Sequence, residues 1–281
     1  MSNAANPAPN HQGMSLSSWG ILLLLSLLWG GSFFFNGVAI QELPVFTIVF
    51  GRVFFAAILL MIFMKFKGIP FPREGSILLA FLFMGFINNF IPFSLIVAGQ
   101  AHISSGLASV LNATTPLFTA VVAHFATTDP TERLGPKRIV GILLGITGVA
   151  ILLSPKIGSV GFSADEIMGQ LAILGAGLAY GIAVVFGRRF GRLGISPVAT
   201  ATGQVTATSI LMLPVMMYVD RPWEFLSSVS IEASLAILGI ALFSTAIAYI
   251  LYFELIKTAG ATNASLVTLI IPVSAMMLGV L

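Results

Sequence analysis

The chain is divided into long apolar stretches that are separated by short polar ones. Nine stretches can be read from the sequence, approximately 18–40, 45–64, 76–98, 103–125, 138–154, 167–187, 196–218, 232–255 and 261–281. As α-helices that rise roughly 1.5 Å per residue, they can cross about 30 Å of hydrocarbon, the fifth only just. Charged residues make up 8% of the chain, against about a quarter in a soluble domain. The sequence therefore predicts an all-α polytopic membrane protein.

Lys and Arg are distributed unevenly between the two sets of loops. Residues 1–17 are polar and rich in Asn, Pro and Ser, which predicts a disordered N-terminal tail. If this tail is cytoplasmic, the inside loops hold ten basic residues, namely Lys65, Lys67, Arg73, Arg133, Lys137, Arg138, Arg188, Arg189, Arg192 and Lys257. The outside loops hold only Lys156 and Arg221. Because basic loops stay in the cytoplasm, we expect a multi-pass protein of the cell inner (plasma) membrane with a cytoplasmic N-terminus.

Two helices that each carry a proline lie 156 positions apart, because Ala108 to Pro116 aligns with Ala264 to Pro272. The segment 28–30 aligns loosely with 179–181, an offset of 151, and Arg52 aligns with Gln204, an offset of 152. Five spans per copy is an odd number, so we expect the second copy to be inverted relative to the first. The predicted organisation is a first repeat at 18–154 (spans one to five) and a second repeat at 155–281 (spans six to nine).

In order and spacing, these motifs resemble the EamA-type families of the drug/metabolite transporter superfamily. The resemblance rests on Leu28-Trp29-Gly30-Gly31-Ser32-Phe33, Leu43-Pro44, Arg52, the Ala108–Pro116 helix, and Glu132-Arg133-Leu134 followed by Gly141, Gly145 and Gly148. It implies two inverted five-helix repeats, a central cavity and transport of small metabolites; similar members include exporters of amino acids, aromatic ones among them. The departures are a long link at 126–131 and a tenth span that would begin beyond Leu281, so we expect a C-terminally shortened chain.

Polar and aromatic side chains recur on single faces of several spans. Those on span one follow i, i+3, i+4 and i+7 spacing, and those on spans three, four, eight and nine lie beside a proline or at repeat-related positions. We predict that they bind substrate; the set is Trp29, Ser32, Phe33, Asn36, Asn88, Asn89, Phe93, Asn112, Tyr180, Ser244, Tyr249, Tyr252 and Thr268. Helix bends are expected at Pro92, Pro116 and Pro272. The alternative interpretation is helix packing through small and polar residues, in which Asn88 or Asn89 satisfies the carbonyl that Pro92 frees.

Arg52 is the charged residue that lies well inside a predicted span. Placing an arginine there opposes membrane insertion by about 2.5–3.5 kcal/mol, so a role is expected for it. It either attracts an anionic group of the substrate or anchors the structure at the outer interface or at a helix end. The neutral Gln204 at the repeat-related position favours the structural role.

Taken together, these features predict a transporter that exports small amphipathic metabolites, with amino acids as the leading class, by alternating access around a central cavity. The same fold carrying drugs, nucleobases or vitamins is the alternative, as is a non-transporting membrane scaffold. The chain has no cysteine, no HExxH motif and three scattered histidines, so no enzyme, metal site or cofactor is expected. The expected partners are a small-molecule substrate and the lipid bilayer, without nucleic acid, and the oligomeric state stays open.

Overall fold

A computed structural model describes residues 14–126 and 163–279 together with parts of 135–148. Within these ranges the chain is helical and contains no strand. Among the described residues, seven helices are long and apolar enough to cross a membrane, and one shorter apolar helix follows them. Most of the tail expected at 1–17 and most of the span expected at 138–154 lie outside the described residues, as does Glu132-Arg133-Leu134.

The helices follow the predicted spans closely. The first half contains α1 (Leu16–Ala39), α2 (Val45–Lys67), α3 (Gly75–Gly85), η1 (Phe86–Phe90), α4 (Ile91–Gln100), α5 (Ser105–Asn112) and α6 (Thr115–Ala126). The second half contains α8 (Ala164–Arg192), α9 (Pro197–Val215), η3 (Met216–Asp220), η4 (Pro222–Glu224), η5 (Leu226–Ser228), α10 (Ile231–Ala241), η6 (Leu242–Ile247), α11 (Ala248–Ala264) and α12 (Val267–Gly279). Serine side chains cap the N-termini of α1, α5, α8, α9 and α10, which satisfies backbone N–H groups that the first helical turn leaves free.

Two of the spans contain a π-helical turn near their middle. One of them is span three, which consists of α3, η1 and α4, and the other is span eight, which consists of α10, η6 and α11. In η1 the backbone N–H of Ile91 bonds to the carbonyl of Phe86, five residues earlier, which lets Pro92 follow without breaking the span. The starts of η1 and η6 differ by 242 − 86 = 156, and those of α3 and α10 by 231 − 75 = 156. The element bounds thus recur at the offset of the proline helices.

The helices that carry Pro116 and Pro272 are interrupted upstream of the proline. In the first, a turn separates Asn112 from Thr115, so Pro116 occupies the second position of α6, where a missing N–H does no harm. In the second, Gly260 has a φ of 83° and α12 begins only at Val267. The span expected from 261 onward therefore forms a shorter helix of 13 residues, with Pro272 inside it.

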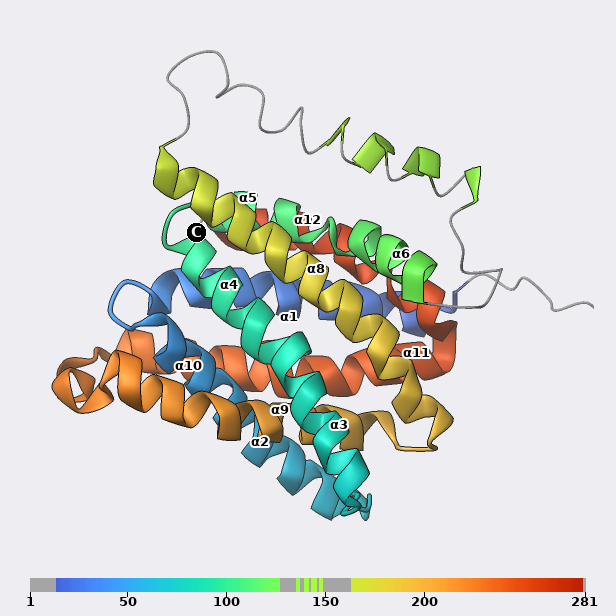
Figure 1. Cartoon of the computed structure of the whole chain (residues 1–281), viewed down its shortest axis with the longest axis horizontal. Helices are drawn as coiled ribbons and strands as arrows, with labels where there is room; N and C mark the ends of the chain where they lie inside the picture. Colours follow the sequence, from blue (N-terminus) through green and yellow to red (C-terminus); the bar gives the residue numbers. More distant parts are fainter. Residues whose placement is uncertain are drawn as a thin grey trace, which may run out of the picture.

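The long first helix of each half packs against a helix of the other half. Figure 1 shows α8 running diagonally beside α6 and α4, while α1 crosses the centre of the bundle and packs along α12. A Cβ atom on Gly30 of α1 would lie 2.9 Å from the backbone nitrogen of Ala275 in α12. One on Gly181 of α8 would lie 2.9 Å from the backbone nitrogen of Thr119 in α6. The glycines of the two crossings lie 181 − 30 = 151 positions apart in the sequence, and the residues that they contact lie 275 − 119 = 156 positions apart.

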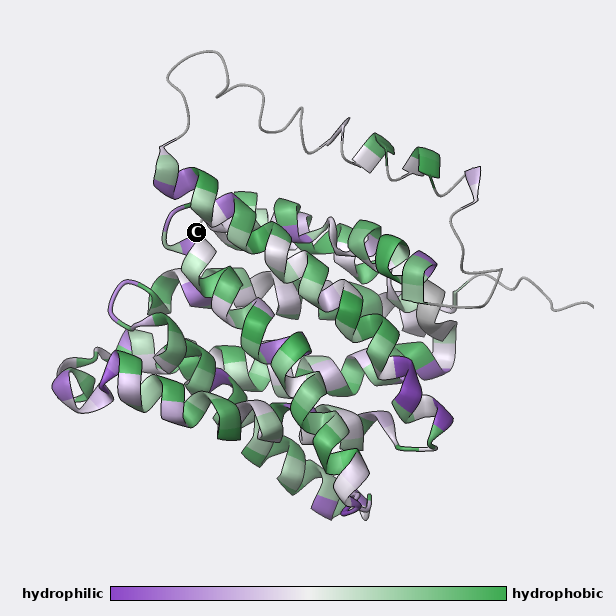
Figure 2. Ribbon diagram, in the orientation of Figure 1, coloured by the Kyte–Doolittle hydropathy of each residue, from purple (hydrophilic) through white to green (hydrophobic). Residues whose placement is uncertain are grey.

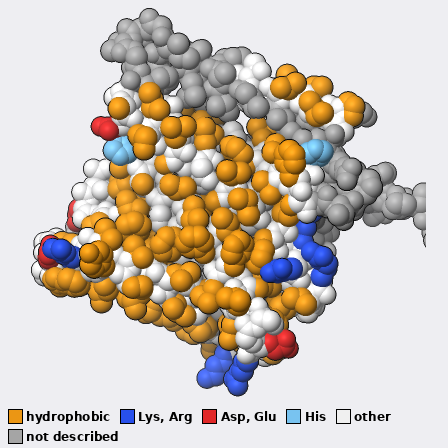
Figure 3. Space-filling view, in the orientation of Figure 1, with side chains coloured by type: hydrophobic (Ala, Val, Ile, Leu, Met, Phe, Trp, Pro, Cys, Tyr) orange, Lys and Arg blue, Asp and Glu red, His pale blue; other side chains and the backbone are white. Residues whose placement is uncertain are grey.

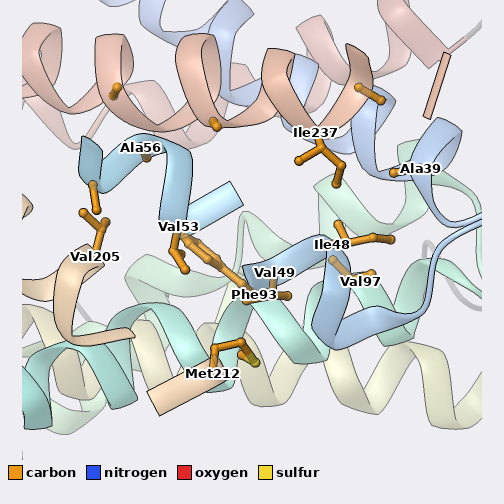
Figure 4. Close-up of a cluster of buried hydrophobic side chains, with 14 of the residues drawn as sticks. Ala39, Ile48, Val49, Val53, Ala56, Phe93, Val97, Val205, Met212 and Ile237 are labelled. Atoms are coloured by element: carbon orange, nitrogen blue, oxygen red, sulfur yellow. The ribbon is translucent and has the colours of Figure 1, made fainter. Parts of the chain in front are cut away.

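Helices α2 and α9 pack against each other and run antiparallel. Near the start of α2, the backbone N–H and hydroxyl of Thr47 donate to Asp220 Oδ2 at 2.6 and 2.8 Å, and Asp220 ends η3. The main buried hydrophobic cluster surrounds α2 and α9. Figure 4 shows Phe93 of α4 between Val49 and Val53 of α2. This cluster holds the helices around the polar groups described below.

Apolar side chains cover the outer surface of the helices. Figure 2 shows hydrophobic residues along the helices and hydrophilic ones mainly toward their ends and in the loops. In Figure 3 hydrophobic atoms cover most of the visible face, while Lys and Arg gather mainly at the right and lower edges. An apolar belt between charged edges is the surface that a bilayer requires of a membrane protein.

Candidate substrate-binding site

The side chain of Arg52 lies in the centre of the bundle and is only 6% exposed. Its Nε donates a hydrogen bond to Thr245 Oγ1 in η6 at 3.0 Å, and its Nη1 donates to Ser32 Oγ in α1 at 3.1 Å. The guanidinium carbon lies 3.6 Å from the centroid of the Phe93 ring in α4, which is a cation–π contact. Residues from three other helical segments therefore converge on this buried cation.

Two tyrosines complete the surroundings of Arg52. Tyr180 in α8 and Tyr249 in α11 pack against the buried cluster that contains Phe93, and both interact electrostatically with the guanidinium. The Tyr249 hydroxyl also donates a hydrogen bond to Asn89 Oδ1 in η1 at 3.1 Å. The cation is thus surrounded by hydroxyl groups and one aromatic ring, all of them neutral.

A cluster of amides lies next to Tyr249 and joins η1 to α9. Asn88 Nδ2 donates to Gln204 Oε1 at 3.0 Å, and Asn89 Nδ2 donates to Thr208 Oγ1 at 3.3 Å. Asn88 also donates to Asn89 Oδ1 at 3.3 Å. Neither amide bonds to the carbonyl that Pro92 frees, so both connect to a neighbouring helix instead of repairing their own.

The contacts of Arg52 and of the amide cluster are related by the repeat offsets. Arg52 and Gln204 differ by 152, and Asn89 and Thr245 differ by 245 − 89 = 156. Arg52 bonds to Thr245, and Gln204 bonds to Asn88, the neighbour of Asn89. In each half, therefore, a polar residue of the second span binds a π-helical turn of the other half.

A separate polar cluster lies toward the end of α1. Asn36 is fully buried, and its Nδ2 donates to Gln100 Oε1 at 2.9 Å. Gln100 Nε2 in turn donates to the Phe33 carbonyl and to Ser105 Oγ, both at 2.9 Å. Asn36 Oδ1 is buried and has no hydrogen-bond partner among the described residues.

The remaining predicted residues form contacts of their own. Trp29 and Tyr252 pack together with ring centroids 5.2 Å apart, and Ser244 Oγ donates to the Leu28 carbonyl at 2.6 Å. Thr268 Oγ1 donates at 2.8 Å to the Ser265 carbonyl at the break before α12. Asn112 ends α5, and its Oδ1 is buried without a hydrogen-bond partner in the described part of the chain. Of the predicted set, the structure brings together Ser32, Asn88, Asn89, Phe93, Tyr180 and Tyr249, with Arg52 among them.

Sequence reasoning did not single out three residues that bind these groups. Gln100 lies just beyond the span expected at 76–98, and Gln204 was noted only as the neutral counterpart of Arg52. Thr208 lies four residues after Gln204 on the same face of α9, a spacing that would have marked a polar stripe facing η1.

Part of the polar centre is shielded from solvent. Arg52 is 6% exposed and Asn89 and Thr245 are fully buried, whereas Tyr180 and Tyr249 are partly exposed. Two open hollows of about 590 and 250 Å³ are apolar, and no predicted substrate-binding residue lines either of them. Within the described residues, no group of three or more His, Cys, Asp or Glu is placed to hold a metal ion.

Comparisons with known proteins identify the family. The EamA-like transporter family matches residues 18–154 and 167–281. The chain is 25% identical over 270 residues to the uncharacterized transporter YoaV of Bacillus subtilis, which covers 92% of this chain and 86% of YoaV. It is 27% identical over 268 residues to the uncharacterized inner membrane transporter YedA of Escherichia coli K12, and the match covers 94% of this chain and 82% of YedA.

A solved crystal structure shares the fold. It superimposes with a TM-score of 0.66 at 19% sequence identity, and the match covers 93% of this chain and 86% of the other. Apart from the first residues of α1 and α8, the matched segments contain all of the long apolar helices that the structure describes. The protein is thus a multi-pass membrane protein that belongs to the EamA-like transporter family.

Proposed function

We propose that the protein is an inner-membrane transporter that exports small amphipathic metabolites, with amino acids as the leading class. Two inverted five-helix repeats would rock about the centre of the bundle and open the polar site to one side of the membrane at a time. The observation that carries this proposal is a set of neutral polar groups and one cation, buried between helices of the two halves. Burying such groups at membrane depth is costly, and it commonly marks a substrate pathway.

The repeated helix crossings support the inverted arrangement. Gly30 against Ala275 and Gly181 against Thr119 are the same contact at the offsets of 151 and 156. A second pair of contacts is related in the same way. A Cβ on Gly51 of α2 would lie 2.6 Å from Ile237 Cγ2, and Gly203 of α9 lies against Phe81. The two glycines lie 203 − 51 = 152 positions apart, and their two contact residues lie 237 − 81 = 156 positions apart. Equivalent helices that pack antiparallel, as α2 and α9 do, are what inverted repeats require.

The side chains around the centre suit a solute with an apolar part and polar ends. Phe93 and the two nearby tyrosines offer aromatic surface, while the asparagine amides and the hydroxyls offer donors and acceptors. The relative YedA is named an inner membrane transporter, which supports the same location for this chain. The positions of the basic loops favour a cytoplasmic N-terminus.

Counterflow in proteoliposomes tests the proposal without knowledge of the coupling ion. Vesicles that contain the purified protein are loaded with an unlabelled amino acid and diluted into a trace of the same labelled compound. An alternating-access carrier exchanges one for the other, so the label accumulates transiently and in a saturable manner. Protein-free vesicles are the control.

Each result of this assay has a defined meaning. Saturable counterflow with one or more of the twenty amino acids supports the proposal. Counterflow only with nucleobases, vitamins or cationic drugs would overturn the amino-acid class and keep the transport function. The absence of counterflow with every compound would contradict alternating-access transport and favour the scaffold.

A further inference from the structure

We infer that Arg52 and Tyr180 form a binding subsite for a carboxylate group of the transported solute. This inference rests on the proposed transport function and names the chemistry of its substrate. The subsite combines a buried guanidinium with a nearby hydroxyl, and both have unused hydrogen-bond donors. The substrate class is therefore a small amphipathic carboxylate.

The charge of Arg52 is not balanced within the described part of the chain. No carboxylate there forms an ion pair with it, and the groups around it are hydroxyls and the Phe93 ring. A buried cation without an anionic partner loses its hydration and regains only part of that energy from neutral groups. A bound carboxylate would supply the missing charge.

Two donors near the cation remain unused. The hydrogen bonds of Arg52 leave from Nε and Nη1, and Nη2 donates to no residue that the structure describes. Tyr180 packs against the buried cluster that contains Phe93, whose ring contacts the guanidinium, and the Tyr180 hydroxyl forms no hydrogen bond within the described residues. Tyr249, by contrast, already donates to Asn89. A carboxylate has two oxygens, and it can accept from Nη2 with one and from the Tyr180 hydroxyl with the other.

A purely structural role for Arg52 makes a different prediction. The bonds to Ser32 and Thr245 join α1, α2 and η6, so neutralising Arg52 would weaken the fold whether or not an anion binds. Removing the Tyr180 hydroxyl breaks no hydrogen bond in the described chain. Tyr180→Phe therefore separates the two roles, because only the binding role needs that oxygen.

The experiment measures binding to the purified full chain by ligand-induced thermal stabilisation. The probes are L-phenylalanine with L-phenylalaninamide, and 3-phenylpropionate with its uncharged amide. In each pair only the carboxylate is replaced. We expect the wild type to bind at least one carboxylate about tenfold or more tightly than its amide, because hydrogen bonds to charged groups are worth about 1.5–3 kcal/mol.

The variants test the assigned residues. We expect Tyr180→Phe to keep the melting temperature of the ligand-free protein and to weaken carboxylate binding several-fold, with amide binding unchanged. Arg52→Gln introduces the residue type that occupies the repeat-related position, Gln204, and it should remove the preference for the carboxylate. If it fails to fold, Arg52→Lys keeps the charge and should keep part of the preference. The matched control is Tyr218→Phe, because Tyr218 is 83% exposed.

The inference is overturned if the wild type prefers the carboxylate in neither pair, or if Tyr180→Phe leaves that preference intact. Counterflow of the same four probes separates this failure from failure of the proposed function. Saturable exchange of the amides without a carboxylate preference would refute the subsite and leave the transporter. Exchange of no probe and of no amino acid would refute both.

Discussion

Gly181 of α8 lies directly against the backbone of Thr119 in α6. A Cβ atom at Gly181 would come within 2.9 Å of the Thr119 nitrogen and 3.0 Å of the Phe118 carbonyl carbon. Backbone atoms cannot move aside as a flexible side chain can, so this crossing depends on the absence of a side chain. The crossing of α1 and α12 at Gly30 and Ala275 repeats the arrangement.

Substituting alanine at this crossing tests its tightness. We expect Gly181→Ala to lower the free energy of unfolding by about 1–3 kcal/mol, because added methyl groups in a tight interface force the helices apart. Thermal unfolding in detergent measures the change. The control is Gly20→Ala in α1, where no atom lies within 4 Å of the added methyl, and where alanine should stabilise the helix by about 0.5–1 kcal/mol. Equal melting temperatures of Gly181→Ala and the wild type would contradict this description.

Asp220 acts as a cap for a helix that is distant in sequence. The N-cap residue of α2, Pro44, forms no side-chain hydrogen bond, and Asp220 binds the backbone N–H of Thr47 instead. We expect Asp220→Ala to destabilise the protein by about 0.5–2 kcal/mol, as the loss of other helix caps does. Glu224→Ala is the control, because Glu224 pairs with Arg221 at 3.6 Å in an exposed ion pair, and such pairs contribute about 0–1 kcal/mol. A larger effect at Glu224 than at Asp220 would reject the capping role.

The hydrogen bond between Tyr249 and Asn89 joins α11 to η1 at the polar centre. We expect Tyr249→Phe to reduce stability by about 0.5–1.5 kcal/mol, since Asn89 Oδ1 keeps one other donor, from Asn88. Melting temperatures measured side by side with exposed Tyr218→Phe provide the test. If the two substitutions have the same small effect, the bond does not contribute to the folded state.

Glu42 links the loop after α1 to the start of α10, and its stabilising effect depends on pH. Hydrogen bonds from the side chain and backbone of Ser230 hold the pKa of this carboxyl below its ordinary value. A carboxyl whose pKa is lower in the folded state stabilises the fold above its unfolded pKa, and this contribution is lost as pH falls through the folded pKa. Glu42→Gln should therefore melt below the wild type near pH 7, and the difference should shrink in acid.

Melting curves of the two proteins between pH 7.5 and pH 4 measure this difference. Glu74→Gln is the matched control, because Glu74 precedes α3 but forms no side-chain cap hydrogen bond. A gap between Glu42→Gln and the wild type that stays constant over this pH range would show that the Ser230 contact does not depend on the charge of Glu42.

Nine spans were expected, and the described residues contain seven long apolar helices and one shorter helix. The bounds of the seven could be predicted from sequence because hydropathy is a local property. Hydropathy decides which segments enter a membrane, and the paired Pro116 and Pro272 reveal a periodicity of 156 without any knowledge of contacts. The break before α6 was harder to predict. A proline fixes only its own φ and the residue before it, so the chain can leave helical geometry upstream, as it does between Asn112 and Thr115.

The partners of the polar side chains depended on the tertiary structure. From sequence, Arg52 was a cation in an apolar helix with several possible roles, and nothing local connects it to Thr245, which lies 193 positions away. Packing decides such contacts, because glycines such as Gly30 and Gly181 let helices of opposite halves approach and bring distant residues together. The sequence by itself thus determined the membrane helices and their periodicity of 156 residues, and the tertiary structure decided which polar groups share the centre.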